Sequence, residues 1–157
     1  MELIRRFPSD LVGRALADWN WLPDLGGKVP MFTSWFGDVF LSGEDGIWFL
    51  DTLEGTLTHQ WPDALSLQAA LNTLEGQDQF LMGGLAQAAL AAGLSPTDIQ
   101  VLSFKILPVI GGSFDVDNIE VSDLEVSLPI MGQVHRQLKD LVPGTKIAGF
   151  TVDGHTP

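Results

Sequence analysis

Short apolar runs separated by turn residues constrain the fold of this chain more than any other feature. The segment from Trp35 to Gly55 reads WFGDVFLSGEDGIWFLDTLEG. Its glycines and acidic residues are the types that tight turns favour, and its apolar runs have strand length. The sequence therefore predicts a three-stranded antiparallel meander. Its parts are a strand over residues 35–42, a turn at Gly43–Gly46, a strand over Ile47–Thr52, a turn at Glu54-Gly55 and a strand over Thr56–Gln60.

The middle strand of this meander is apolar at four consecutive positions, Ile47 to Leu50. A strand that is covered on one face alternates apolar and polar residues, whereas a strand covered on both faces reads as a continuous apolar run. We therefore expect this strand to be central, or to have one face in an interface. The same reasoning places Trp48 in the core.

Helical periodicity appears on both sides of the meander. Apolar residues spaced along one helical face predict a helix that starts at Ser9, as N-cap, and ends near Asn20. Further helices are expected over Leu65–Leu71, over Asp78–Ala92 and from Pro129 to about Leu141.

Later strands are expected over Leu102–Val109, Ile119–Leu128 and Lys146–Val152. In the second of these the alternation changes phase at Asp123-Leu124, which predicts a bulge or a break into two strands. Strands that cluster apart from helices are typical of α+β proteins. The predicted fold is thus an antiparallel sheet, the meander plus the later strands, packed with about four helices.

The length of 157 residues suits a single domain. We expect an N-terminal helix and connector over residues 1–28 and an α+β domain over residues 29–157, the whole chain forming one globular unit. The first residues, MELIRRFPSDLVGR, include an early acidic residue and lack the apolar region of a secretory signal peptide. No apolar run approaches the roughly 20 residues that span a bilayer. These features predict a soluble, cytoplasmic protein without a membrane partner.

Several kinds of chemistry lack support in the sequence. Without cysteine there are no disulfides, thiolate metal sites or cysteine nucleophiles. The glycine-rich motifs that bind nucleotides are missing. FDVDNIE offers Asp115, Asp117 and Glu120, but it lacks the glycine and spacing of a calcium loop. We therefore expect no cofactor, no metal and no catalytic residue. The alternative is a small hydrolase or ligand-binding enzyme that uses Asp115, Asp117 or His135.

The charge of the chain is strongly negative and unevenly distributed. The formal net charge is -12, and no lysine or arginine occurs between Lys28 and Lys105. A field of this sign repels nucleic acids and anionic lipids, and it attracts basic proteins. A simpler interpretation is that the acidity only keeps the protein in solution. A further alternative is a housekeeping interaction domain with an unknown partner.

Three stretches resemble a family of predicted bacterial proteins. They are an FGDVF…WFLDTLEG hairpin at Phe36–Gly55, an LNTLEGQDQFLM segment at Leu71–Met82, and PVIGGSFDVDNIEV…GQVHRQLKDLVPGTKI at Pro108–Ile147. The family is similar to the C-terminal domain of type VI secretion immunity proteins that neutralise a DNase toxin. The resemblance implies a non-enzymatic inhibitor whose partner is a basic toxin or nuclease.

The hairpin supplies the residues that we expect to bind such a partner. Glu44, Asp45, Asp51 and Glu54 offer carboxylates, and Trp35 offers an aromatic anchor of the kind enriched in binding hot spots.

Overall fold

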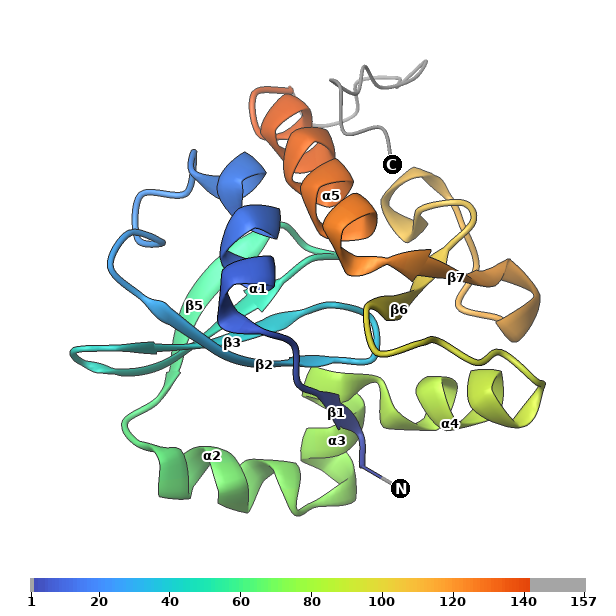
Figure 1. Ribbon diagram of the computed structural model, residues 1–157, viewed down its shortest axis with the longest axis horizontal. Helices are drawn as coiled ribbons and strands as arrows, with labels where there is room; N and C mark the ends of the chain where they lie inside the picture. The colour runs from blue at the N-terminus through green and yellow to red at the C-terminus, as the bar shows by residue number, and fades with distance from the viewer. Residues whose placement is uncertain (1, 142–157) are drawn as a thin grey trace.

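A five-stranded antiparallel sheet occupies the centre of the computed structural model, which describes residues 2–141 (Figure 1). Its strand order follows the chain, and the strands are β1 (Ile4–Arg5), β2 (Val29–Ser34), β3 (Val39–Gly43), β4 (Gly46–Asp51) and β5 (Thr56–Trp61). A second antiparallel sheet pairs β6 (Gln100–Phe104) with β7 (Ile119–Asp123). The predicted meander is confirmed, and two further strands precede it at the edge.

Helices cover both faces of the five-stranded sheet (Figure 1). On one side lie α1 (Ser9–Ala15), a 3₁₀ turn at Ala17–Trp19, and α5 (Leu124–Leu138). On the other side lie α2 (Ala64–Leu71) and α3 (Leu74–Leu81), while α4 (Gly83–Ala91) packs against the β6–β7 sheet. This is the α+β architecture that the sequence predicts, with antiparallel strands segregated from helices.

The coverage of both faces explains the continuous apolar run in β4. Leu50 faces α1 and α5 and is completely buried, whereas Phe49 faces α2 and α3 and is 5% exposed. The strand also has a neighbour on each side, since it pairs with β3 and with β5. The prediction of a central strand is confirmed. Trp48 is an exception, because it packs against the cluster of Leu50 but its side chain stays half-buried.

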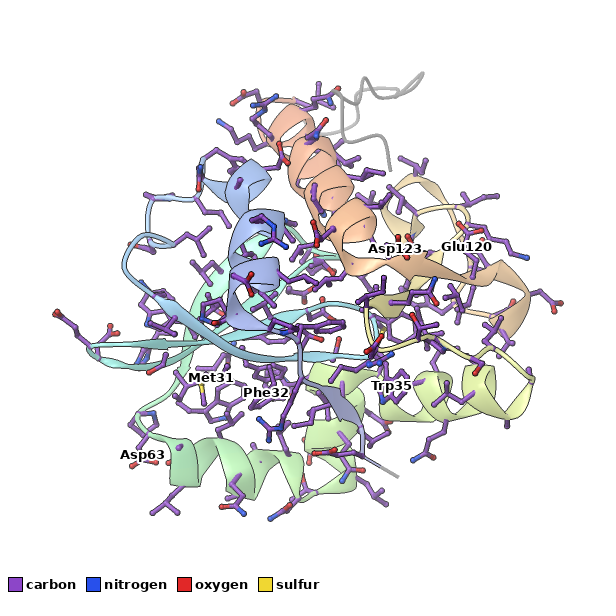
Figure 2. All side chains as sticks on the ribbon, in the orientation of Figure 1. Met31, Phe32, Trp35, Asp63, Glu120 and Asp123 are labelled. Carbon is purple, nitrogen blue, oxygen red and sulfur yellow. The ribbon has the colours of Figure 1, made fainter. Side chains whose placement is uncertain are left out.

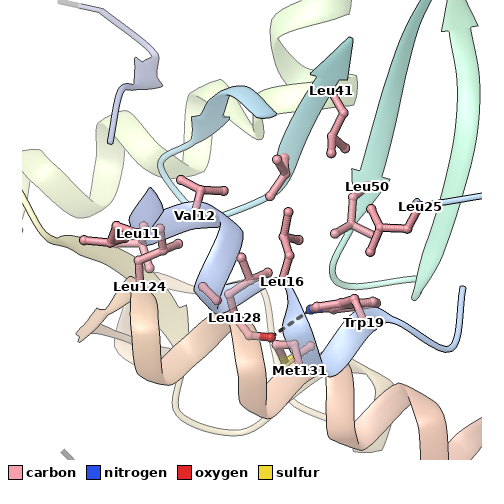
Figure 3. Close-up of a cluster of buried hydrophobic side chains, with 13 residues drawn as sticks. Leu11, Val12, Leu16, Trp19, Leu25, Leu41, Leu50, Leu124, Leu128 and Met131 are labelled. Atoms are coloured by element: carbon pink, nitrogen blue, oxygen red, sulfur yellow. Dashed lines mark hydrogen bonds between the residues drawn. The ribbon is translucent and has the colours of Figure 1, made fainter. Parts of the chain in front are cut away.

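Trp19 lies in the core between α1, α5 and the sheet (Figure 3). Trp19 is fully buried, and its Nε1 donates a hydrogen bond of 2.9 Å to the carbonyl oxygen of Leu128 in α5. Val12 and Leu16 of the N-terminal segment pack in the same cluster as Leu128. The first helix is therefore part of the core of the domain.

The strand predicted over residues 35–42 is wrong at its start. β2 ends at Ser34, a turn follows, and β3 begins at Val39. The hydroxyl of Ser34 accepts hydrogen bonds from the backbone N–H groups of Phe36 and Asp38, which closes the turn. Local side-chain bonding of this kind competes with strand formation and is invisible to an apolar pattern.

The helix predicted over Asp78–Ala92 is in fact two helices. Met82 adopts a left-handed backbone conformation (φ 47°) between α3 and α4, so the chain turns there. Because of this break, residues 2–141 contain five α-helices where about four were expected.

The strand predicted over Ile119–Leu128 ends at Asp123, and α5 starts at the next residue. The phase change in the sequence therefore marks the start of a helix. Leu124, Leu128 and Met131 lie on its buried face, with Pro129 inside its second turn. The strand predicted at Lys146–Val152 falls outside the described residues.

Candidate functional site

The acidic residues of the meander lie at two ends of the sheet. Glu44 and Asp45 form the turn between β3 and β4, whereas Asp51 and Glu54 belong to the turn between β4 and β5. β4 has 6 residues, and an antiparallel strand rises roughly 3.4 Å per residue, so the two ends are about 20 Å apart. The structure does not bring the four carboxylates into one site.

The β3–β4 tip, which we define as Gly43–Gly46, extends to the side of the molecule in Figure 1. Asp45 Oδ1 accepts a hydrogen bond of 2.8 Å from Trp48 Nε1, and this bond is the main reason why the pKa of Asp45 is lowered. His59 Nε2 lies 2.7 Å from the carbonyl oxygen of Asp45. The ammonium of Lys28 sits 4.0 Å from the centre of the Trp48 ring. The tip therefore carries a rigidly held carboxylate, beside the exposed Glu44.

Trp48, His59 and Lys28 are contacts of this tip that the sequence does not reveal. Apolar patterning placed Trp48 in the core, although it lies only three residues after Asp45. His59 comes from β5, and Lys28, which contacts the Trp48 ring, comes from the connector before β2. No local spacing links these segments.

Trp35 lies toward the opposite end of the sheet and contacts the chain's own N-terminus. Figure 2 shows it on the side away from Asp63, the residue that caps α2. The guanidinium of Arg5 lies 4.5 Å from the centre of its ring, and its Nε1 donates 2.9 Å to the carbonyl oxygen of Glu2. These contacts hold β1 and cover part of the ring that a partner would use.

A buried polar cluster, which we define as Asp38, Thr52 and His135, connects two turns to α5. Asp38 Oδ1 accepts from the backbone N–H of Thr52 at 2.8 Å and from its hydroxyl at 2.6 Å. His135 Nε2 lies 2.7 Å from the carbonyl oxygen of Thr52, an atom that only accepts, so this nitrogen carries the proton. Thr52 is thereby held from both sides.

Burial shifts the pKa of both titratable groups in this cluster toward their neutral forms. It raises the pKa of Asp38 to about 6, with the negative charge of Asp51 as the next cause. It lowers the pKa of His135, against the opposing effects of the Thr52 carbonyl and of Asp51 and Glu54. Each shift follows from the cost of moving a charge out of water.

A pocket of about 220 Å³ lies beside this cluster, between the β6–β7 sheet and α5. Thr52 and Leu53 of the β4–β5 turn form one wall. The apolar lining further includes Phe36, Leu107, Val126, Ile130 and Met131. The polar lining consists of Thr52, Ser103, Glu120, Ser122 and Ser127.

The residues of the enzymatic alternative are not assembled around this pocket. Asp115 and Asp117 are exposed in the loop before β7, and His135 is buried against Thr52. Asn118 uses its amide to hold this loop, through Ile106 and the carbonyl oxygen of Ser113. Within residues 2–141, no group of three or more His, Asp or Glu side chains is arranged to hold a metal ion.

Comparison with known proteins adds to the fold and not to the site. The architecture belongs to the α+β class. The structure of this chain is similar to the crystal structure of Atu4351 from Agrobacterium tumefaciens. The TM-score is 0.54 at 20% sequence identity, and the similarity covers 80% of this chain and 62% of that one. No protein-family model and no curated protein matches the sequence. None of the helices in the described part of the chain has the length and hydrophobicity to cross a membrane.

Proposed function

We propose that this protein is a non-enzymatic acidic binding module that recognises a basic protein, as an immunity-type inhibitor of a toxin such as a secreted nuclease. The observation that carries the proposal is the folding of the cation-free interval. Every element from β2 to β6 is built from residues 29–104, which contain no lysine or arginine. These elements include the β3–β4 tip and helices α2, α3 and α4, and the carboxylates among them have no lysine or arginine within the same interval. The nearest cations come from the flanking segments, where Arg5, Arg6 and Lys28 lie against the rings of Trp35, Phe32 and Trp48.

The β3–β4 tip is the part of this surface best suited to enter a basic groove. Its carboxylates are exposed at the end of the β3–β4 hairpin, and Asp45 is held by Trp48 and His59. A charge that is held in place before binding loses less conformational entropy on association. The negative potential would also speed the encounter with a cationic surface. Lys28 offsets part of this charge, because it contacts the Trp48 ring beside the tip.

Exposed leucines on the helical side of the same region favour protein binding over a role in solubility alone. Leu65 is 77% exposed and Leu74 is 80% exposed, and they neighbour Asp63, at the N-cap of α2, and Glu75. Apolar side chains among carboxylates are the combination that an interface with a basic, partly apolar partner requires.

Co-expression tests the proposal directly. The chain is expressed together with the protein encoded by its neighbouring gene in a host that lacks both, and growth is recorded. We expect the neighbour to stop growth and this chain to restore it, with the purified pair forming a complex whose association slows as salt rises. Failure to restore growth, with no complex formed, would contradict the proposal.

Matched variants locate the contact, since the two acidic ends are about 20 Å apart. The first is Glu44→Lys, which reverses one charge at the tip and leaves the Trp48–Asp45 hydrogen bond in place. The second is Glu54→Lys at the opposite end. We expect the tip variant to slow association about tenfold or more and the Glu54 variant to leave it nearly unchanged. Equal effects of the two would rule out the tip as the contact.

A further inference from the structure

We infer that the pocket between α5 and the β6–β7 sheet is a binding site for a small amphipathic amine, with an apolar body inside and its ammonium group on Glu120. The pocket is distinct from the β3–β4 tip, and the inference does not depend on the proposed partner.

The volume and the apolar lining of the pocket limit the size of the ligand's apolar part. About 220 Å³ is available, less than the roughly 300–1,000 Å³ of pockets that hold drug-sized molecules. Phe36, Leu107, Val126 and Ile130 supply apolar contact from three separate segments. A single ring or a short alkyl chain fits these walls.

Four polar side chains of the pocket, those of Ser103, Glu120, Ser122 and Ser127, are available to bind the head of the ligand. Ser103 lies opposite Glu120 in the β6–β7 register, and Ser122 follows two residues later on the same face of β7. Ser127 faces them from α5. Within residues 2–141, no hydrogen bond engages the hydroxyl groups of these three serines, and no ion pair engages Glu120.

The negative charge of the pocket lining favours a ligand whose polar group is positively charged. Glu120 is exposed at the β7 side of the molecule (Figure 2), and the lining contains no lysine, arginine or histidine. An anionic ligand would meet a carboxylate here and a protein of net charge -12 around it. An ammonium group gains a charge-assisted hydrogen bond to the carboxylate, with serine hydroxyls as further acceptors.

The pocket is also held in shape before any ligand enters. Thr52 in its wall is fixed by Asp38 on one side and by His135 on the other. Leu102, which lines the pocket, donates its backbone N–H to the carbonyl oxygen of Trp35 at 2.7 Å. A preformed site of this kind binds without a large cost of ordering.

Three probes of nearly equal shape test the inference: 2-phenylethylamine, 2-phenylethanol and 3-phenylpropionate. Each is titrated into the full-length ¹⁵N-labelled protein, and backbone amide shifts are recorded. We expect the amine to give saturable shifts centred on Ser103, Ser122 and Ser127, with binding at least about tenfold tighter than that of the propionate. Absence of saturable shifts with all three probes, or shifts spread over the acidic surface, would overturn the inference.

Variants separate the two parts of the site. Glu120→Gln should weaken the amine about tenfold and leave the alcohol nearly unchanged. Asp117→Asn, which removes an exposed carboxylate outside the lining, is the matched control and should change neither. Ser127→Phe fills the pocket and should abolish binding of both. If its spectrum shows that it does not fold, Ser122→Leu replaces it. Amine binding that survives both Glu120→Gln and a folded filling variant would place the ligand elsewhere.

Discussion

At the residue scale, the most unusual group of this protein is the carboxyl of Asp38. It is 4% exposed, and it accepts hydrogen bonds from Ser34 and Thr52 without a cation beside it among the described residues. A buried carboxyl of this kind gains stability from being neutral, which is why its pKa rises to about 6 from the ordinary 3.8. Its structural role is to tie the β2–β3 turn to the β4–β5 turn.

We expect the titration of Asp38 to make the free energy of unfolding depend on pH. Between pH 3.8 and 6 the folded state binds more protons at this group than the unfolded state does, so its contribution to the free energy of unfolding falls as pH rises. The full change is about 3 kcal/mol. Asp38→Asn removes it, since asparagine does not titrate.

Urea unfolding of wild type and Asp38→Asn at pH 4 and at pH 7 measures this effect. We expect the difference in unfolding free energy to shift in favour of the variant at the higher pH. The lowered pKa of His135 acts in the opposite direction, with stability rising toward pH 6.5, and it is present in both proteins. A difference that stays constant with pH would show that Asp38 titrates normally.

Gly55 is required where the β4–β5 turn meets α5. Its φ is +72°, and a Cβ at this position would lie 2.5 Å from the imidazole of His135. We expect Gly55→Ala to lower the free energy of unfolding by about 2 kcal/mol or more, from backbone strain and from the clash together. Chemical denaturation measures the loss.

Gly27→Ala is the matched control for this substitution. Gly27 has φ +81°, close to that of Gly55, and nothing lies within 4 Å of the added Cβ, so only backbone strain destabilises that variant. The excess loss at Gly55 over Gly27 reports the contact with His135. Equal losses would contradict close packing of the turn on α5.

At the scale of elements, the packing of the N-terminal segment on α5 organises one half of the core. Trp19 and Trp21 both donate their Nε1 hydrogens to carbonyl oxygens of α5, at 2.9 and 3.1 Å. The two rings stack with centroids 5.8 Å apart. α5 in turn supplies His135 to the buried cluster and Ser127 to the pocket, so the N-terminal segment supports both.

Trp19→Phe is expected to destabilise the protein by about 1–3 kcal/mol, because it removes a buried hydrogen bond and part of a buried ring. Trp21→Phe loses an equivalent bond at a half-buried position and should cost less. Thermal unfolding followed by circular dichroism compares the two. A larger effect at Trp21 would show that the bond to Leu128 does not matter for the core.

At the scale of the whole molecule, negative charge is not balanced by ion pairs. The ion pairs between side chains of residues 2–141 involve two cations, Arg14 and Lys139, with Asp10, Glu125 and Asp140, and all are exposed. Exposed pairs contribute little to stability. Repulsion among the remaining carboxylates therefore opposes the compact state.

Salt is expected to stabilise the protein for this reason. Raising NaCl from a few millimolar to physiological strength shortens the screening length to about 8 Å, and we expect the melting temperature to rise by about 2–4 °C. Glutamine at the exposed positions Glu44, Glu54 and Glu75 reduces the repulsion, so that variant should respond less to salt. A melting temperature that falls with added NaCl would show that attraction between charges dominates.

The fold was predictable to the extent that it follows from local periodicity. The meander and α2 are found from apolar spacing and turn residues within a few positions of one another. Two features were not predictable from local periodicity: the left-handed conformation of Met82 and the start of α5 at Leu124. Both depend on packing against α4, β6 and the sheet. The separation of Glu44 from Asp51 was already implied, since consecutive turns of a meander lie at opposite ends of the sheet.

The amino-acid sequence alone determined the antiparallel meander and the acidic field, since both depend on composition and on spacings of a few residues. The tertiary structure decided that Thr52, Ser103 and Ser127 share one pocket, that His59 contacts the Asp45 carbonyl, and that Trp35 contacts Arg5. The pocket residues are positioned by the packing of α5 and β6–β7 on the sheet. Contacts between segments so distant in the chain leave no periodic pattern in the sequence, because each segment is constrained only by the surface it meets.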